Sequence, residues 1–263
     1  MKAIIRQELK LNFKSLLIWA LTVGGLGFIC TLMYTSMEGD VMEMADTFSQ
    51  MGAFSDAFGM STLSIATLAG FFATEVGTVH GLGSAMYAAF FGASMLSKEE
   101  DGHTGEYLFS LPVSRGKVVI AKGIAILINL ILFTVICGIF YVLGFAVLEE
   151  ELPVKEMMRF LCSMLLMNIE VASISYLISA TSSKTRIGLG LGVSLIIYTY
   201  DIMGRVIPDL KDYLFIGPFS FSNASEIFAG HAAPEYSLLL SVVITAAALA
   251  TTYFYYTRKD LAS

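Results

Sequence analysis

Charged residues are scarce in this chain: Asp, Glu, Lys and Arg together supply 14% of its 263 residues. A soluble domain usually carries about a quarter. The shortage is concentrated in long apolar blocks, and 56% of all residues are hydrophobic, which is the pattern of a polytopic membrane protein. The net charge is −6 and the bases form no continuous face, so we expect no nucleic-acid partner.

Cysteine is rare as well. The three cysteines all lie inside apolar runs and none belongs to a paired motif, which argues against a disulfide framework and against a zinc site. No G-x-x-x-x-G-K-[ST] phosphate cradle, H-E-x-x-H motif or Ser-His-Asp arrangement can be traced. We therefore expect no catalytic residue, no metal and no cofactor bound by this chain. The cysteines are Cys30, Cys137 and Cys162.

What the chain does contain is a series of apolar runs of about 20 residues, the length that a hydrocarbon core of about 30 Å requires. The sequence thus predicts an all-α fold with six transmembrane helices in a single transmembrane domain, residues 1–263. The predicted spans are Ser15–Tyr34, Val76–Leu96, Ile124–Val147, Met157–Ala180, Ile187–Val206 and Ser237–Thr257.

Basic residues gather on one side of these spans. Because loops rich in Lys and Arg are retained in the cytoplasm, this side is interpreted as cytoplasmic, with both termini inside. We expect a multi-pass protein of the cell membrane, with the lipid bilayer as one partner. The bases on this side are Lys2, Arg6, Lys10, Lys14, Lys98, Arg115, Lys117, Lys122, Lys184, Arg186, Arg258 and Lys259.

Two connections on the outer side are longer than simple turns. In residues 40–58 ("DVMEMADTFSQMGAFSDAF"), apolar and acidic residues alternate at helical spacing, which predicts an amphipathic helix on the outer surface. Residues 208–236 are rich in phenylalanine and contain the helix-breaking pair Gly217 and Pro218. Ser222 or Asn223 can cap a short helix that ends near Gly230, so this segment is predicted to form a helical hairpin before the last span.

The longest cytoplasmic connection, residues 97–117, reads "SKEEDGHTGEYLFSLPVSRGK". Thr104 can cap a short helix with Glu106 in its first turn. Tyr107, Leu108 and Leu111 would form the apolar face, and Pro112 ends the run. The pattern alone leaves two interpretations open: a helix that binds another protein, or an ordinary amphipathic helix resting on the bilayer.

The next helix can begin after Ser114, and it enters the membrane past Lys117 and Lys122. A lysine near the end of a span can extend its ammonium group back to the lipid headgroups. We expect both lysines to do so.

The same stretch resembles the signature of the type-2 permeases of ATP-binding-cassette exporters. In that family an acidic run and a Gly-Thr-type turn precede Glu-x-Leu-Leu-x-x-Pro-Val-Ser-Arg, and a Gly-Lys pair follows. This chain offers residues 99–102 ("EEDG"), 104–108 ("TGEYL") and 111–115 ("LPVSR"). It departs by His103 before Thr104, by Phe109 at the second leucine, and by the reversed order "KG" at 122–123. The resemblance extends over most of the chain, including "GPFSFSNASEIFAG" in the outer hairpin segment.

The resemblance implies a non-catalytic permease subunit of an exporter in a bacterial cell membrane. ATP would be bound by a separate cytoplasmic ATPase that docks on the predicted helix, and a second permease chain, identical or related, would complete the translocation path. The residues that the resemblance assigns to ATPase coupling are Glu100, Gly102, Thr104, Gly105, Glu106, Tyr107, Leu108, Leu111, Pro112 and Arg115.

Small residues four positions apart indicate where helices can approach closely. The pairs Gly188 and Gly192, in the fifth span, and Gly77 and Gly81, in the second, have this spacing. We expect them at helix–helix contacts.

Ionisable residues inside spans are costly and are candidates for function. Glu170, with Asn168 nearby, lies in the middle of the fourth span, where it either contacts substrate or joins two helices as a hydrogen-bonded carboxyl group. Glu75 and His80 are expected near the outer end of the second span, within reach of water. Asp201, at the outer end of the fifth span, is expected to be solvated.

Two other classes of protein are alternatives to the permease. An ion-coupled secondary transporter could use Glu170, Glu75 or His80, but such carriers tend to show internal repeats, and none is convincing here. An intramembrane enzyme would need a catalytic constellation that the sequence lacks.

Overall fold

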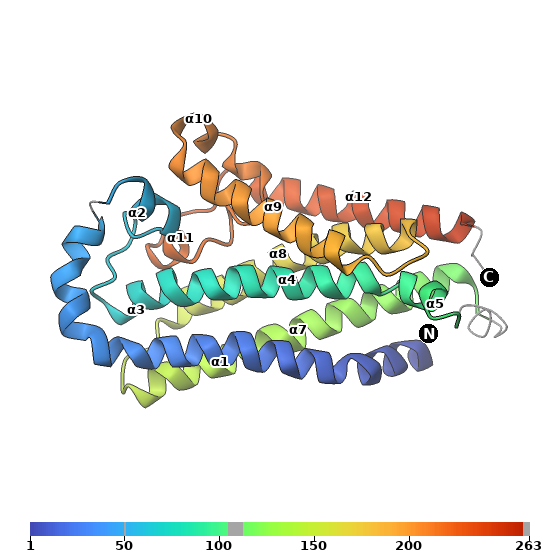
Figure 1. Ribbon diagram of the computed structural model, residues 1–263, viewed down its shortest axis with the longest axis horizontal. Helices are drawn as coiled ribbons and strands as arrows, with labels where there is room; N and C mark the ends of the chain where they lie inside the picture. The colour runs from blue at the N-terminus through green and yellow to red at the C-terminus, as the bar shows by residue number, and fades with distance from the viewer. Residues whose placement is uncertain (50, 105–112, 260–263) are drawn as a thin grey trace.

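The computed structural model describes residues 1–49, 51–104 and 113–259. Within these ranges the chain is helical, without strands, and forms an elongated bundle (Figure 1). Five helices are long and apolar enough to cross a membrane, so the chain is a multi-pass membrane protein. They are α1 (Lys2–Ser49), α7 (Arg115–Val147), α8 (Val154–Thr181), α9 (Ile187–Val206) and α12 (Ser237–Arg258).

The predicted second span corresponds to α4 (Gly77–Ser94), which follows α3 (Leu68–Phe71) and the π-helix η1 (Phe72–Val76) without a break. α4 is not among the five apolar helices. Its sequence is rich in glycine and alanine, and its side chains are largely buried against α1, α8 and α9. A helix that is surrounded by protein meets little lipid and therefore does not need an apolar surface of its own.

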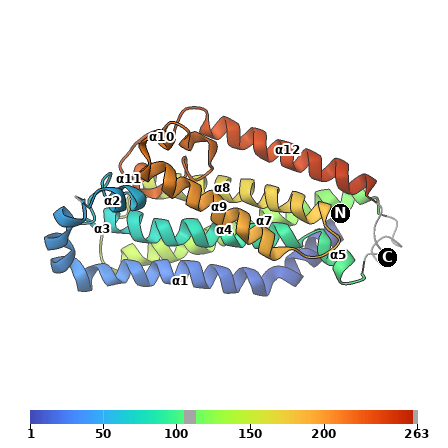
Figure 2. The same ribbon diagram turned by 45° about the horizontal axis from the view of Figure 1, so that its top comes forward.

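Both views place the amino terminus, the carboxyl end of α12 and α5 (Ser97–Asp101) at one end of the bundle (Figures 1 and 2). We call this the termini end. The opposite end carries α2 (Ala53–Phe58), α10 (Pro208–Lys211), the 3₁₀-helix η2 (Leu214–Ile216) and α11 (Ala224–Phe228). The predicted cytoplasmic and outer loops are therefore separated as the distribution of bases requires.

The separate amphipathic helix predicted for residues 40–58 is wrong. The backbone of residues 40–49 continues α1, and α2 begins only after Gly52, whose φ of +57° lies in the left-handed region. Gly39, the only glycine between the predicted span and this turn, does not interrupt α1, because a single glycine is tolerated in a helix. The apolar run in the sequence therefore indicates which part of α1 meets lipid. It does not indicate how long the helix is.

The outer hairpin segment instead contains three short helical elements, α10, η2 and α11. The predicted cap is confirmed at Asn223, whose side-chain oxygen accepts from the Glu226 amide at the start of α11. Gly230 follows the helix with φ +81°. Phe219 and Phe221 are buried, which explains why a loop carries so many aromatic residues.

Aromatic side chains hold the core where η1, α7 and α8 meet. The ring of Phe72 packs edge-on against Tyr141, Phe145 and Phe160 with ring centroids 5.2, 5.5 and 6.1 Å apart. Such T-shaped pairs contribute about 0.5–1.5 kcal/mol each beyond the area they bury. The core thus fixes the start of the central helix against two neighbouring spans.

The two predicted glycine pairs have different surroundings. A Cβ atom on Gly77 would lie 2.4 Å from that of Ala224, so α11 approaches α4 at this position, and Gly81 makes ordinary contact with Phe219. Gly188 and Gly192 meet no atom within 4 Å in the described part of the chain. They face away from the bundle.

Candidate functional site

The candidate site is a cluster of charged residues at the termini end, where α4 passes into α5. α4 ends at Ser94, and the chain bends at Met95 and Leu96 before α5 begins. The hydroxyl oxygen of Ser179, on α8, accepts hydrogen bonds from the amides of Leu96 and Ser97, each at 2.9 Å. This bend is therefore fixed to α8 and does not fray as a loose helix end would.

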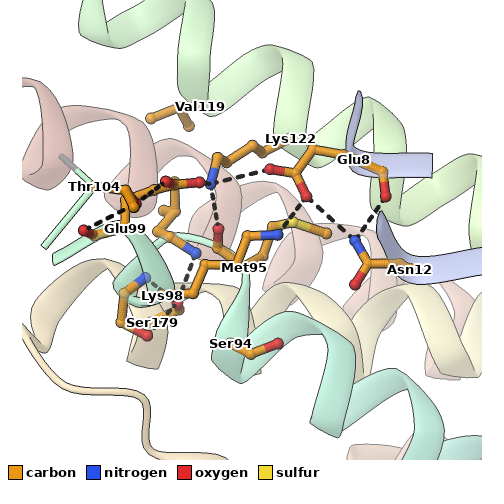
Figure 3. A network of polar contacts seen from close by, with 12 residues as sticks. Glu8, Asn12, Ser94, Met95, Lys98, Glu99, Thr104, Val119, Lys122 and Ser179 are labelled. Atoms are coloured by element: carbon orange, nitrogen blue, oxygen red, sulfur yellow. Dashed lines mark hydrogen bonds and ion pairs between the residues drawn. The ribbon is translucent and has the colours of Figure 1, made fainter. Parts of the chain in front are cut away.

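Lys122 lies at the centre of the cluster (Figure 3). Its side chain is fully buried, and the ammonium group donates to the Met95 carbonyl at 2.7 Å and to Glu99 Oε1 at 2.6 Å. Glu8 Oε1 lies 3.2 Å from the same nitrogen. The prediction that Lys122 extends to the lipid headgroups is wrong, because two carboxylates and a carbonyl satisfy the ammonium group inside the protein.

Glu8, near the start of α1, connects the first helix to this centre. Its carboxylate accepts hydrogen bonds from the ammonium group of Lys98 and, at 3.2 Å, from the Asn12 amide. Only 4% of the Glu8 side chain is exposed. The two acids and two bases balance in charge, which is how buried ionic groups are tolerated.

Glu99 is held in its ionised form. Burial raises the pKa of its carboxyl group, but the nearby Lys122 ammonium and hydrogen bonds from Lys122 and Thr104 more than offset this, so that the pKa is lowered overall. The Thr104 hydroxyl donates to Glu99 Oε2 at 2.7 Å. Thr104 directly precedes the segment 105–112 and is thus hydrogen-bonded to the cluster.

A second group of contacts ties α5 to the end of α12 and to the connection between α8 and α9. Lys259 Nζ donates to Glu100 Oε1 at 2.7 Å and to the Ser182 carbonyl at 2.9 Å. The Arg115 guanidinium donates to the Lys259 carbonyl. Asp101 accepts from the Thr185 amide at 3.2 Å, and this hydrogen bonding lowers the pKa of its carboxyl group.

The structure brings together four of the residues assigned to ATPase coupling. Glu100, Thr104 and Arg115 make the contacts above, and Gly102 closes α5 with its amide donating to the Lys98 carbonyl at 2.9 Å. The other six lie outside the described residues. They are Gly105, Glu106, Tyr107, Leu108, Leu111 and Pro112.

Sequence reasoning missed most of the cluster. Lys122 carried the clearest signal, because it lies two helical turns into α7 with apolar residues around it, too deep for an end-of-helix lysine. Glu8 was the other signal, an acid in an otherwise basic amino-terminal stretch. The remaining missed members are Lys98, Glu99, Ser179 and Lys259.

The polar residues in the middle of α8 are buried. Glu170 lies beside Ser241 of α12. Oε2 of Glu170 and both polar atoms of the Asn168 amide have no partner among the described residues. The pair is a second, incompletely satisfied polar site.

Glu75 and His80 do not share an environment. His80 is fully buried, with Nδ1 2.7 Å from the Tyr141 hydroxyl, so the prediction that water reaches it is wrong. Glu75 is exposed within η1. The five-residue separation places the two side chains on different faces of the helix.

The opposite end of the bundle holds a cavity of about 600 Å³ lined by both acids and bases. Asp201 is buried there in an ion pair with Arg205, four residues further along α9, and the expectation that Asp201 is solvated is wrong. His231 Nδ1 lies 2.6 Å from Glu226 Oε2, and Arg159 donates to the His231 carbonyl at 2.5 Å. These contacts surround the cavity mouth.

A bundle of long apolar helices, with its charged groups concentrated at the two ends, defines an integral membrane protein. The family model described as "ABC-2 family transporter protein" matches residues 2–261, so the chain belongs to the ABC-2 transporter family. It is thus a permease of ATP-binding-cassette-type transporters. A comparison with curated proteins finds no significant match.

Proposed function

We propose that the chain is the permease subunit of an exporter and that a separate cytoplasmic ATPase drives it through residues 97–117. The observation that carries this proposal is the attachment of both sides of the segment 105–112 to the ionic contacts of α5, through its neighbouring acids Glu99 and Glu100. Thr104 is bonded to Glu99 on one side, and Arg115 is bonded to Lys259, the partner of Glu100, on the other. A displacement of the segment would therefore reach the cluster directly.

The cluster distributes such a displacement over several spans. Glu8 belongs to α1, Lys122 to α7, Ser179 to α8 and Lys259 follows α12. Because packed helices and satisfied ion pairs have few alternative arrangements, a shift of α5 moves these helices together. ATP-driven closure of the ATPase would in this way be converted into opening of the permease.

The proposal includes six spans, with α4 as the sixth, and a cytoplasmic termini end. α4 has the length of a span and lies among α1, α8 and α9. The clustered bases favour the cytoplasm for the end that holds both termini.

A second permease chain is expected on the outer face of α9. Half of the most apolar window of α8 is buried, against 22% for α9, so α9 has a largely uncovered surface. Gly188 and Gly192 lie on it without neighbours in the described chain. Small residues at this spacing allow close approach of another helix.

The first experiment is purification of the tagged chain in mild detergent with mass spectrometry of the proteins that accompany it. A stoichiometric soluble ATPase is expected. Glu106→Lys and Leu111→Trp should each reduce its recovery at least tenfold, because they change the charge or shape of the docking segment. Glu151→Lys, an exposed charge reversal at the opposite end, is the matched control and should retain the ATPase.

Normal recovery of the ATPase with both docking variants would contradict the assignment of this segment. A chain that is purified alone, even after crosslinking, would favour the ion-coupled secondary transporter. The observation behind that alternative is the buried pair Glu170 and Asn168 with its unpartnered atoms. Transport that depends on an ion gradient and is lost in Glu170→Gln would then be expected.

A further inference from the structure

An apolar cavity lies on the flank of the bundle between α7, α8 and α12. Its volume is about 320 Å³, and its walls include Val119, Gly123, Leu130, Ala172 and Leu249. All three helices are membrane-spanning, so the medium next to the cavity is hydrocarbon. A ligand that enters from this side is therefore apolar where it meets the walls.

Two of the three hydroxyl groups in the walls, those of Ser173 and Tyr176, are already occupied. The Tyr176 hydroxyl donates to the Val119 carbonyl at 2.8 Å, and the Ser173 hydroxyl donates to the Ile169 carbonyl at 2.7 Å. Neither donates to the cavity, so its interior offers a polar ligand little compensation for the loss of water. Most polar solutes are therefore excluded, and a hydrocarbon chain is the ligand that matches these walls.

The extent of the cavity matches one leaflet. From Val119 to Leu130 the wall follows twelve residues of α7, and the eleven steps between them give a rise of about 16 Å at 1.5 Å per residue. Half of a hydrocarbon core of about 30 Å is about 15 Å. Because α7 begins at the termini end, the cavity runs along the leaflet on that side.

Groups that suit a lipid headgroup stand at the termini end of the cavity. A Cβ atom on Gly116 would lie 2.7 Å from the Tyr253 hydroxyl, which places this phenol beside the first turn of α7. Lys117 and Arg258 are exposed at the same end and have no ion-pair partner among the described residues. Tyrosine and basic residues at the end of a span are typical of the membrane interface, and bases there attract anionic lipids.

We propose that this cavity binds one acyl chain of an anionic phospholipid from the leaflet at the termini end. The apolar walls hold the chain, and the headgroup would meet the Tyr253 hydroxyl and the exposed bases Lys117 and Arg258, which stand at the same end of α7 and α12. Gly123 makes the room, because a Cβ atom there would have only the Tyr176 ring nearby, at 3.9 Å. The inference rests on the membrane placement of these helices and is independent of the ATPase.

The test is native mass spectrometry of the full chain, released from detergent after addition of phosphatidylglycerol or of phosphatidylcholine with the same acyl chains. One phosphatidylglycerol per chain should be retained in preference to phosphatidylcholine. Gly123→Leu fills the cavity and should weaken retention of phosphatidylglycerol at least tenfold. Gly25→Leu, where a Cβ atom meets nothing within 4 Å, is the matched control and should bind like the unchanged chain.

The double variant Lys117→Gln with Arg258→Gln changes only exposed side chains, so it tests the proposal even if Gly123→Leu fails to fold. It should reduce the preference for phosphatidylglycerol several-fold. A folded Gly123→Leu chain that retains the lipid as tightly as the Gly25→Leu control would overturn the proposed site. Equal retention of both lipids, or preferential retention of a free fatty acid, would overturn the anionic phospholipid as its occupant.

Discussion

The two ends of this bundle differ in how open their charged pairs are. At the termini end the central ion pair is buried, with 1% of the Lys122 side chain and 4% of the Glu8 side chain exposed. At the opposite end Asp201 is buried beside Arg205, but the pair of His231 and Glu226 is open, with 58% and 42% exposed, and it borders a cavity of about 600 Å³. A buried pair fixes helices in one arrangement, whereas an open pair is reached by water. Under the proposed function, the termini end would transmit movement and the opposite end would admit a solute.

The largest expected effect is that of Lys122→Met, which breaks the cluster from its centre. The change leaves the Glu8 and Glu99 carboxylates and the Met95 carbonyl without this ammonium group. Removing one partner of a buried ion pair costs about 3–5 kcal/mol, and we expect a loss of that size in the free energy of unfolding. Denaturant unfolding in detergent micelles measures it, with Lys10→Met, an exposed lysine of α1, as control.

The double variant Lys122→Met with Glu8→Gln should recover part of this loss, because one uncompensated charge is removed as well. If Lys122→Met unfolds like the Lys10→Met control, the cluster does not hold the helices together.

A smaller effect is expected from the protonation of Glu99. Its pKa in the folded chain is lowered from the ordinary value of 4.5, so its contribution to stability is present above about pH 4.5 and is lost as the pH falls through the lowered folded value. Glu99→Gln should cost about 1.5–3 kcal/mol at pH 7, the range for hydrogen bonds to charged groups. The difference between Glu99→Gln and the unchanged chain should shrink below pH 4.5.

Unfolding free energies from pH 7 to pH 3 give this comparison, and Glu151→Gln, at an exposed carboxylate, should show no such convergence. A constant difference across that range would mean that the ionised form of Glu99 is not what stabilises the cluster.

The smallest effect is expected at the opposite end. His231→Gln removes the open pair with Glu226, and exposed pairs contribute about 0–1 kcal/mol. Stability should change by no more than this, and 0.5 M salt should remove the difference because screening weakens exposed pairs. A loss of unfolding free energy as large as that of Lys122→Met would contradict the proposed difference between the two ends.

The parts of the fold that face lipid could be predicted from the sequence. Lipid forces long apolar helices and keeps bases on one side, so the helices and the separation of the loops follow from composition and spacing. The Asn223 cap was also readable, because a cap depends on residues three positions apart. Constraints that lipid imposes on a segment, or that act between near neighbours in the chain, can therefore be recognised in short stretches of sequence.

The cluster could not be predicted, because its contacts join residues that are distant in the chain. Glu8 and Lys122 are 114 positions apart, and no periodicity in either stretch marks the other as a partner. For the same reason the sequence predicts that Lys122 extends to the headgroups, because nothing near Lys122 in the sequence identifies Glu8 as its partner. The burial of His80 and Asp201 likewise depends on neighbours from other helices.

The ion pair of Glu100 with Lys259 has a consequence for the order of synthesis. The two residues are 159 positions apart, so a ribosome that has just completed α5 has most of the chain still to make. During that time the Glu100 carboxylate has no counter-charge from α12, and the half-built protein carries an unneutralised acid at the membrane surface. The pair can close only after α12 has been made, so it forms later than the contacts of Lys122 with Glu8 and Glu99, whose residues all precede α8.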